Sequence, residues 1–192
     1  IDIGCGKGGF LLDSASSSTE KQNFLGLEIR PSVVQYAQER AVKWNLSDRL
    51  QFIGCNANVD VERLLSAYTQ VGGGHIEMVS IQFPDPLFKK SKQKRRVVTP
   101  DLVQTLAKFV PQGKQVFIQS DIKEVFDLMR KEIREFNIYF QDSIENMEET
   151  LETNPLEVPT ERELSVLKQD LPVYRTLFIR TDKPFDENNI EN

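Results

Sequence analysis

Apolar residues in this chain form short runs that alternate with amphipathic stretches. The runs at 1–4, 23–29, 50–55, 76–83 and 114–120 have the length of strands and are followed by turn or helix signals. The run at 76–83, IEMVSIQF, is almost continuously apolar, which is typical of a central parallel strand that is covered on both faces. The pattern therefore predicts a sheet whose middle strands are buried.

Amphipathic helices are predicted between these strands. Apolar residues recur at three- and four-residue spacing in 32–45 and in 121–136, and shorter helical segments are expected at 8–16, 61–68 and 100–110. Strands and helices that alternate in this way form right-handed crossovers and a parallel sheet with helices on both faces. The predicted fold class is therefore α/β.

The start of the helix at 32–45 carries a capping signal. Ser32 follows Pro31, and Gln35 stands three residues after Ser32, which matches a capping box. We therefore expect Ser32 to be the N-cap residue of this helix.

The C-terminal third of the chain departs from the alternation. Two last strands are expected at 137–140 and 174–181, and no long helix separates them, which favours one antiparallel edge strand in a sheet of seven. Between 142 and 172 the periodicity weakens and acidic residues dominate. A segment of this length is expected to be a functional loop with some helix.

Length and composition fit one globular domain. The chain has 192 residues, of which 39% are hydrophobic and 28% are charged. We expect a single domain over 1–183, truncated at its N-terminus because it opens inside a strand, and a disordered tail over 184–192. No apolar run approaches the roughly 18 residues of a membrane span, so we expect no membrane role.

Metal-ligating residues are scarce. The chain has two cysteines, Cys5 and Cys55, and one histidine, His75, which are too few for a metal cluster, and no metal is predicted. Two free thiols are typical of a reducing intracellular compartment such as the cytoplasm, the nucleus or an organelle.

The formal net charge of −5 conceals an uneven distribution of charge. The basic run (89–96) contains six cations, which are Lys89, Lys90, Lys92, Lys94, Arg95 and Arg96. The stretch 142–163 carries eight acidic residues and one base, Arg162. Because clustering decides how a protein meets a polyanion, the basic run favours a nucleic-acid partner.

A glycine turn follows the first strand directly. Gly4 and Gly6, together with Gly8 or Gly9, allow the backbone to turn sharply and a ligand to approach it closely. Glu28 ends the second strand, where a carboxylate can accept hydrogen bonds from both hydroxyl groups of a ribose. Turn and acid together favour an adenosine-type cofactor, either a nicotinamide dinucleotide or S-adenosylmethionine.

Two further segments follow strands that end at the same edge of the predicted sheet. Asn56 and the small Ala57 come after the third strand, where an amide can bind the edge of an adenine. Asp85 comes after the fourth strand between Pro84 and Pro86, which restrict the backbone and remove two amide donors. A rigidly held carboxylate is therefore expected close to the cofactor.

Six segments together resemble the tRNA (guanine-N7)-methyltransferases. They are IDIGCGKGGF (1–10), LGLEIR (25–30), CNA (55–57), FPDPLFKKSKQKRR (83–96), QSD (119–121) and PTERE (159–163), which stand in the order of that family. The resemblance extends from residue 1 to about residue 183. It implies a Rossmann-like methyltransferase of seven strands that uses S-adenosylmethionine to form N7-methylguanosine at position 46, in the variable loop of tRNA.

The resemblance also implies roles for individual residues, matched by position. The expected cofactor contacts are Asp2, Gly4, Gly6, Glu28, Arg30, Asn56, Ala57 and Asp85, and Asp85 is also the expected catalytic residue, as an active-site carboxylate. The expected substrate contacts are Lys89, Asp121, Thr160, Glu161, Arg162 and Glu163. The other cations of the basic run, Lys90, Lys92, Lys94, Arg95 and Arg96, are expected to contact the tRNA backbone.

The residues leave two other functions open. A nicotinamide-dependent oxidoreductase would use the glycine turn and Glu28, but it has no use for the basic run. A non-catalytic RNA-binding subunit would keep the cations, but it would not need Glu28 and Asp85. The sequence also leaves open whether a partner subunit or a homodimer is required.

Overall fold

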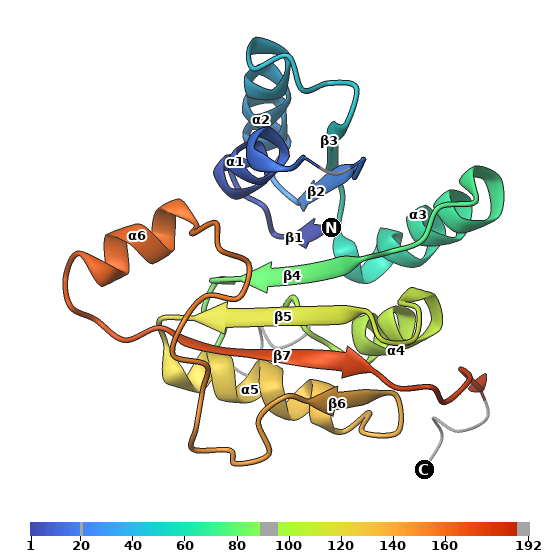
Figure 1. Ribbon diagram of the computed structural model, residues 1–192, viewed down its shortest axis with the longest axis vertical. Helices are drawn as coiled ribbons and strands as arrows, with labels where there is room; N and C mark the ends of the chain where they lie inside the picture. Colours follow the sequence, from blue (N-terminus) through green and yellow to red (C-terminus); the bar gives the residue numbers. More distant parts are fainter. Residues whose placement is uncertain (20, 89–95, 188–192) are drawn as a thin grey trace.

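The computed structural model describes residues 1–19, 21–88 and 96–187. Its centre is one seven-stranded sheet with the order β3-β2-β1-β4-β5-β7-β6 (Figure 1). The strands are β1 (Asp2–Ile3), β2 (Phe24–Glu28), β3 (Leu50–Gly54), β4 (Met78–Gln82), β5 (Gln115–Ser120), β6 (Phe140–Asp142) and β7 (Tyr174–Arg180).

The sheet is mostly parallel, as predicted. The neighbours from β3 through β2, β1 and β4 to β5 all pair in parallel. Strand β7 is antiparallel to both β5 and β6, and it lies between them. The antiparallel pairing expected at this end of the sheet is therefore confirmed. The consecutive strands β6 and β7 are antiparallel neighbours, and such strands can be joined without a crossover.

The helices cover both faces of the sheet, as predicted. They are α1 (Gly9–Ser17), α2 (Pro31–Lys43), α3 (Ala57–Gly72), α4 (Pro100–Phe109), α5 (Lys123–Arg134) and α6 (Glu161–Leu167). Side chains alternate between the faces along β2: Phe24 packs with α1 and α2, whereas Leu25 and Leu27 pack in the cluster that α3, α4 and α5 complete. Within the described ranges, none of the helices is both long and apolar enough to span a membrane.

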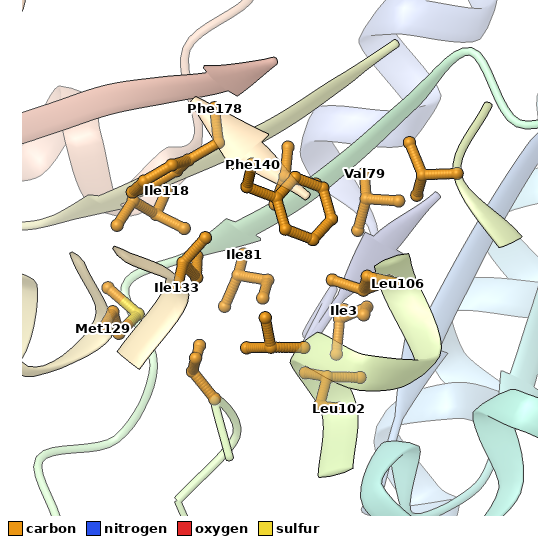
Figure 2. Packing of buried hydrophobic residues seen from close by; sticks show 14 of the residues in the cluster. Ile3, Val79, Ile81, Leu102, Leu106, Ile118, Met129, Ile133, Phe140 and Phe178 are labelled. Atoms are coloured by element: carbon orange, nitrogen blue, oxygen red, sulfur yellow. The ribbon is translucent and has the colours of Figure 1, made fainter. Parts of the chain in front are cut away.

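The larger apolar cluster fixes the central strands against α4 and α5 (Figure 2). Each of its labelled side chains is at most 5% exposed; they are Ile3, Val79, Ile81, Leu102, Leu106, Ile118, Met129, Ile133, Phe140 and Phe178. In a core packed this closely, removal of even one methylene group lowers the stability of the folded protein. The carboxyl ends of β1, β4 and β5 are therefore held in a constant relation to one another.

The predicted cap of α2 is wrong. The helix begins at Pro31, Arg30 is its N-cap residue, and no side chain caps it. Proline suits the first helical position because its ring presets φ and its missing N–H would have no partner there. Ser32 therefore lies inside the first turn rather than in front of it.

The segment between β6 and β7 contains a helix, α6, as expected. Its first part is held by Arg130 of α5, whose side chain is fully buried. The guanidinium donates to Asp142 Oδ2 at 2.7 Å and to the carbonyl oxygens of Ile144, Asn146, Met147 and Glu149. The Arg130 side chain thus holds the irregular segment 142–149 in place.

The beginning of the expected tail contacts the domain. The Phe185 ring lies 5.5 Å from the Tyr139 ring, and the Tyr139 hydroxyl donates to the carbonyl oxygen of Asp186 at 3.1 Å. Lys108 forms an ion pair with Glu187 at 3.2 Å. These contacts hold residues 185–187 against α4 and against Tyr139, which directly precedes β6, and residues 188–192 lie outside the described residues.

Replacement of Arg130 with alanine is expected to lower the free energy of unfolding by about 3–5 kcal/mol, because it leaves the buried Asp142 carboxylate without its main cation. Urea unfolding followed by circular dichroism measures the loss. Lys131→Ala is the matched control, since the neighbouring Lys131 is 71% exposed and pairs with Glu135 at 3.8 Å. An Arg130→Ala protein as stable as the Lys131→Ala control would contradict the stabilising role given to Arg130.

Candidate functional site

The glycine turn between β1 and α1 is closed on one side and open on the other. The amides of Gly4 and Cys5 donate to the carbonyl oxygen of Leu27, which ties the turn to β2. A Cβ atom on Gly8 would lie 2.4 Å from Phe52 Cζ, whereas one on Gly4 or Gly6 would meet nothing within 4 Å. The turn therefore packs on the core through Gly8 and presents bare backbone at Gly4 and Gly6.

Glu28 ends β2 beside this turn, as predicted, and it is bound by Arg30. Glu28 Oε1 accepts from the Arg30 amide and from Arg30 Nε, and Oε2 accepts from Arg30 Nη2, all at 3.0 Å. Burial raises the pKa of Glu28, but the hydrogen bonds and the charge of Arg30 outweigh this, so that the net pKa is lowered. Glu28 is therefore an ionised carboxylate, and Oε2 still has a lone pair for another donor.

Asn56 follows β3 and caps α3. Its Oδ1 accepts from the Asn58 amide at 3.2 Å, and its own amide donates to Asp60 Oδ2 at 3.1 Å. Ala57 is the first residue of the helix. Because the cap uses the side-chain oxygen, the NH₂ group of the exposed Asn56 side chain is not used in the cap.

Asp85 reaches the same edge after an abrupt turn at the end of β4. Phe83 has a φ of 50°, in the left-handed region, and its amide donates to the carbonyl oxygen of Gln119 at 2.9 Å. Such a conformation costs an aromatic residue about 1–3 kcal/mol and is found mostly at functional sites. The pKa of Arg30 is raised mainly by its hydrogen bonds to Glu28 and, to a smaller extent, by the charge of the exposed Asp85.

Asp2 lies inside the sheet at the start of the site. It is 4% exposed, and its Oδ1 accepts from Ser80 Oγ at 2.7 Å and from Gln82 Nε2 at 3.3 Å. Burial raises the pKa of Asp2, and these two hydrogen bonds oppose the rise. Asp2 therefore links β1 to Ser80 and Gln82 of β4, and Gln82 directly precedes Phe83.

Glu163 lies on the buried face of α6, although the resemblance implies a substrate contact. It is 2% exposed, its Oε1 accepts from Arg175 Nη2 at 3.1 Å, and its Oε2 accepts from Gln119 Nε2 at 3.0 Å and from Asn154 Nδ2 at 2.8 Å. The same Gln119 nitrogen donates to Gln82 Oε1 at 2.8 Å. A continuous polar path thus runs from Asp2 across the sheet to α6.

The other members of the PTERE segment lie at the start of α6. Thr160 is the N-cap residue, and its Oγ1 accepts from the Glu163 amide at 3.0 Å. Arg162 forms a short ion pair with Asp121, which follows β5. Glu161 lies 3.6 Å from Arg40 of α2. The structure therefore brings Asp121 and the PTERE segment together, on the side of the sheet edge next to β5 and β7.

The basic run is described only at its last residue. Arg96 donates through Nε to the carbonyl oxygen of Leu87 at 3.2 Å, and its own carbonyl oxygen accepts from Asn58 Nδ2 at 2.8 Å. Lys89, Lys90, Lys92, Lys94 and Arg95 lie outside the described residues. Their expected contacts with substrate and with the tRNA backbone stay predictions.

The polar path contains residues that the sequence reasoning missed. Gln82 and Gln119 are register partners in β4 and β5, and Arg175 pairs with Gln119 across β5 and β7. A signal existed, because both apolar strand runs contain an Ile-Gln pair near their carboxyl ends. The TERE segment also matches a capping box, but its Glu163 points into the buried path instead of returning to the Thr160 amide.

Known proteins match this chain over most of its length. A family model described as "Putative methyltransferase" matches residues 1–176. The chain is 46% identical to the tRNA (guanine-N(7)-)-methyltransferase of Synechococcus elongatus over 94% of this chain and 80% of that protein. The enzyme of the same name from Prochlorococcus marinus is 42% identical over 100% of this chain and 79% of its own.

A solved structure shares the fold. The SAM-dependent O-methyltransferase from Thermotoga maritima aligns with 96% of this chain and 60% of its own, with a TM-score of 0.56 and 12% identity. At this identity the likeness concerns the arrangement of strands and helices and not the reaction. It supports the predicted Rossmann-like fold class.

The two sides of the glycine turn are expected to respond differently to alanine. Gly8→Ala should lower the free energy of unfolding by about 2–4 kcal/mol, because its Cβ meets the Phe52 ring in the left-handed backbone region. Gly6→Ala should lower it by about 1–2 kcal/mol, since only backbone strain is added.

Gly6→Ala should also weaken the binding of S-adenosylhomocysteine, because its Cβ projects into the open space in front of the turn. Urea unfolding and isothermal titration calorimetry measure the two effects. Equal stability of the two variants, or unchanged affinity of Gly6→Ala, would contradict this description of the turn.

Proposed function

Because the chain belongs to the tRNA (guanine-N7)-methyltransferase family, we propose that it transfers a methyl group from S-adenosylmethionine to N7 of a guanine in tRNA. The proposed target is the guanine at position 46, in the variable loop. The observation that supports the proposal is that Glu28, bound by Arg30, and the segment with Asp85 follow the carboxyl ends of β2 and β4, the two strands that flank β1 and its glycine turn. A rigid acid and a nucleoside site thus share one edge of the sheet.

The residues at the glycine turn fit S-adenosylmethionine. Open space in front of Gly4 and Gly6 lets a ligand reach the backbone, and the ionised Glu28 has acceptor capacity left for a ribose hydroxyl. The NH₂ group of Asn56 can donate to a ring nitrogen of adenine, next to the small Ala57. When bound, S-adenosylmethionine supplies a methyl group on a positively charged sulfur.

The chain has to align the target base rather than remove a proton from it. N7 of guanine keeps a free lone pair, so no general base is needed before the methyl group is transferred. The contribution of the protein is therefore positioning and electrostatic stabilisation of the ring that becomes positively charged. Residues that hold the base and present a negative charge to it meet both needs.

Asp85 is proposed to fill this role. Its carboxylate can accept hydrogen bonds from the N–H groups of guanine and favours the positive charge that develops on the purine. Pro84 and Pro86 limit its backbone freedom, and the Phe83 turn directs the segment away from β4. Asp85 thus acts as an orienting and electrostatic residue.

The substrate side is proposed to be formed by the start of α6 and by Asp121. Thr160 is half-buried there, Glu161 and Arg162 are exposed, and Arg162 is paired with Asp121. The burial of Glu163 supports a role in holding α6 in place rather than direct contact with RNA. Lys89 and the other cations of the basic run would bind phosphates, with the salt sensitivity that counterion release brings.

The alternatives are less well supported. Family membership favours methyl transfer over a nicotinamide-dependent oxidoreductase. An ionised Glu28 that is hydrogen-bonded by Arg30, together with a second carboxylate, Asp85, after β4, favours an enzyme over a non-catalytic RNA-binding subunit. Whether a partner subunit is required is tested by incubating the purified chain alone with tRNA.

The purified chain is expected to form N7-methylguanosine when it is incubated with labelled S-adenosylmethionine and an unmodified tRNA transcript. Nucleoside analysis by mass spectrometry identifies the product. A transcript with adenosine at position 46 is the control and should remain unlabelled. Label at another nucleoside would contradict the proposed reaction, and N7-methylguanosine in the control transcript would contradict position 46 alone.

Asp85→Asn is expected to reduce kcat by about a hundredfold, because the neutral amide cannot stabilise the developing positive charge. The affinity for tRNA should change little, since it depends mainly on phosphate contacts. Asp48→Asn removes the same charge from an exposed residue just before β3, at the opposite edge of the sheet, and should leave kcat within about twofold of wild type. Near-normal turnover of Asp85→Asn with tight tRNA binding would refute the role given to Asp85.

A further inference from the structure

Arg40 of α2 connects two parts of the site that lie on different elements. Its Nη1 donates to the carbonyl oxygen of Lys7, in the glycine turn, at 2.9 Å. The same nitrogen lies 3.6 Å from Glu161 Oε1, at the start of α6. The inference drawn here rests on the proposed function, in which the turn serves the methyl donor and α6 serves the RNA.

The contact between α6 and the glycine turn is close. A Cβ atom on Gly9 would lie 2.9 Å from Glu161 Oε1 and 3.1 Å from Glu161 Cδ, so the Glu161 carboxylate lies directly against the Gly9 backbone. Gly9 begins α1, and no side chain caps this helix. A carboxylate next to the first turn of a helix interacts favourably with the partial positive charge there.

Three consecutive residues of α6 attach the helix to three places. Glu163 binds β5 and β7 through Gln119 and Arg175, Arg162 pairs with Asp121 after β5, and Glu161 meets Arg40. The first two attachments secure α6 to the β5–β7 side of the sheet. The third secures it to the turn on β1, across the edge where methyl donor and base would meet.

We infer that Arg40 is a positioning residue for methyl transfer: by binding Lys7 and Glu161 together, it fixes the start of α6 relative to the glycine turn. It does not touch the reacting atoms. Its effect is to set the distance and the angle between a base held by the α6 side and a methyl donor held by the turn. Displacements on the order of 1 Å at such a site can reduce the rate a hundredfold.

A simple surface ion pair would not have this arrangement. The Glu161 side chain is 65% exposed, but that of Arg40 is only 22% exposed, and the Arg40 guanidinium also lies 5.9 Å from the centre of the Tyr36 ring. The hydrogen bond to the Lys7 carbonyl is directional, and it involves no atom of Glu161. The two partners of Arg40 can therefore be separated by mutation.

Four variants of the full chain test the inference, namely Arg40→Ala, Arg40→Lys, Glu161→Gln and the double variant Arg40→Ala/Glu161→Gln. Arg63→Ala is the matched control, because Arg63 forms a pair with Asp60 at the same 3.6 Å but within α3 and with 81% of its side chain exposed. For each protein, kcat and KM for tRNA, the Kd for tRNA, the Kd for S-adenosylhomocysteine and the melting temperature are measured.

Arg40→Ala is expected to lower kcat about tenfold and to weaken S-adenosylhomocysteine binding a few-fold, with the Kd for tRNA within about twofold of wild type. Arg40→Lys should recover part of the loss. Glu161→Gln should lower kcat but spare S-adenosylhomocysteine binding, because the Lys7 contact remains. The double variant should be no slower than Arg40→Ala, since one interaction is removed only once.

Three outcomes would overturn the inference. The first is an Arg40→Ala protein whose kcat and S-adenosylhomocysteine affinity both match those of Arg63→Ala. The second is a loss of kcat that follows the melting temperature alone across the variants. The third is fully additive effects of the two single variants.

If wild type binds S-adenosylhomocysteine but does not methylate tRNA, the proposed function fails. In that case, unchanged S-adenosylhomocysteine affinity of Arg40→Ala would separately reject the link between Arg40 and Lys7.

Discussion

The arrangement of the site depends on the buried carboxylate of Glu163. A charged group that is 2% exposed is tolerated only with nearly complete pairing, and this one has Arg175, Gln119 and Asn154 as partners. Those partners come from β7, β5 and the segment before α6, so all three must be in place at once. The start of α6, with its exposed polar residues, is consequently fixed at the edge of the sheet by an interaction that never reaches the surface.

The same path stabilises the strained end of β4. Gln82 binds Asp2 on one side and Gln119 on the other, and the next residue, Phe83, adopts a left-handed backbone conformation while donating to Gln119. Strain of about 1–3 kcal/mol persists only where surrounding contacts over-determine the geometry. Here the hydrogen bonds of three neighbouring strands do so, and the result is a fixed turn through which the chain continues from β4 to Asp85.

The sequence predicts the parts of this molecule that periodicity and strand order control. Seven strands, the helices between them and the shared edge of Glu28 and Asp85 follow from apolar runs and from the rule that parallel strands end together. The pairing of Gln82 with Gln119 depends on register, which apolar runs leave undetermined. The burial of Glu163 could not be foreseen either, because a T-x-x-E segment matches a helix cap equally well in solvent.

The contrast between Glu163 and Asp85 explains how rigidity and reactivity are divided in this fold. Glu163 is desolvated permanently, so its interactions serve structure. Asp85 is exposed in the free protein, where water screens its charge strongly. A bound base would displace that water and lower the local dielectric, so that the attraction between Asp85 and a developing positive charge grows when substrate is present. Energy from phosphate contacts with the rest of the RNA can offset this desolvation, which gives remote cations an influence on the chemical step.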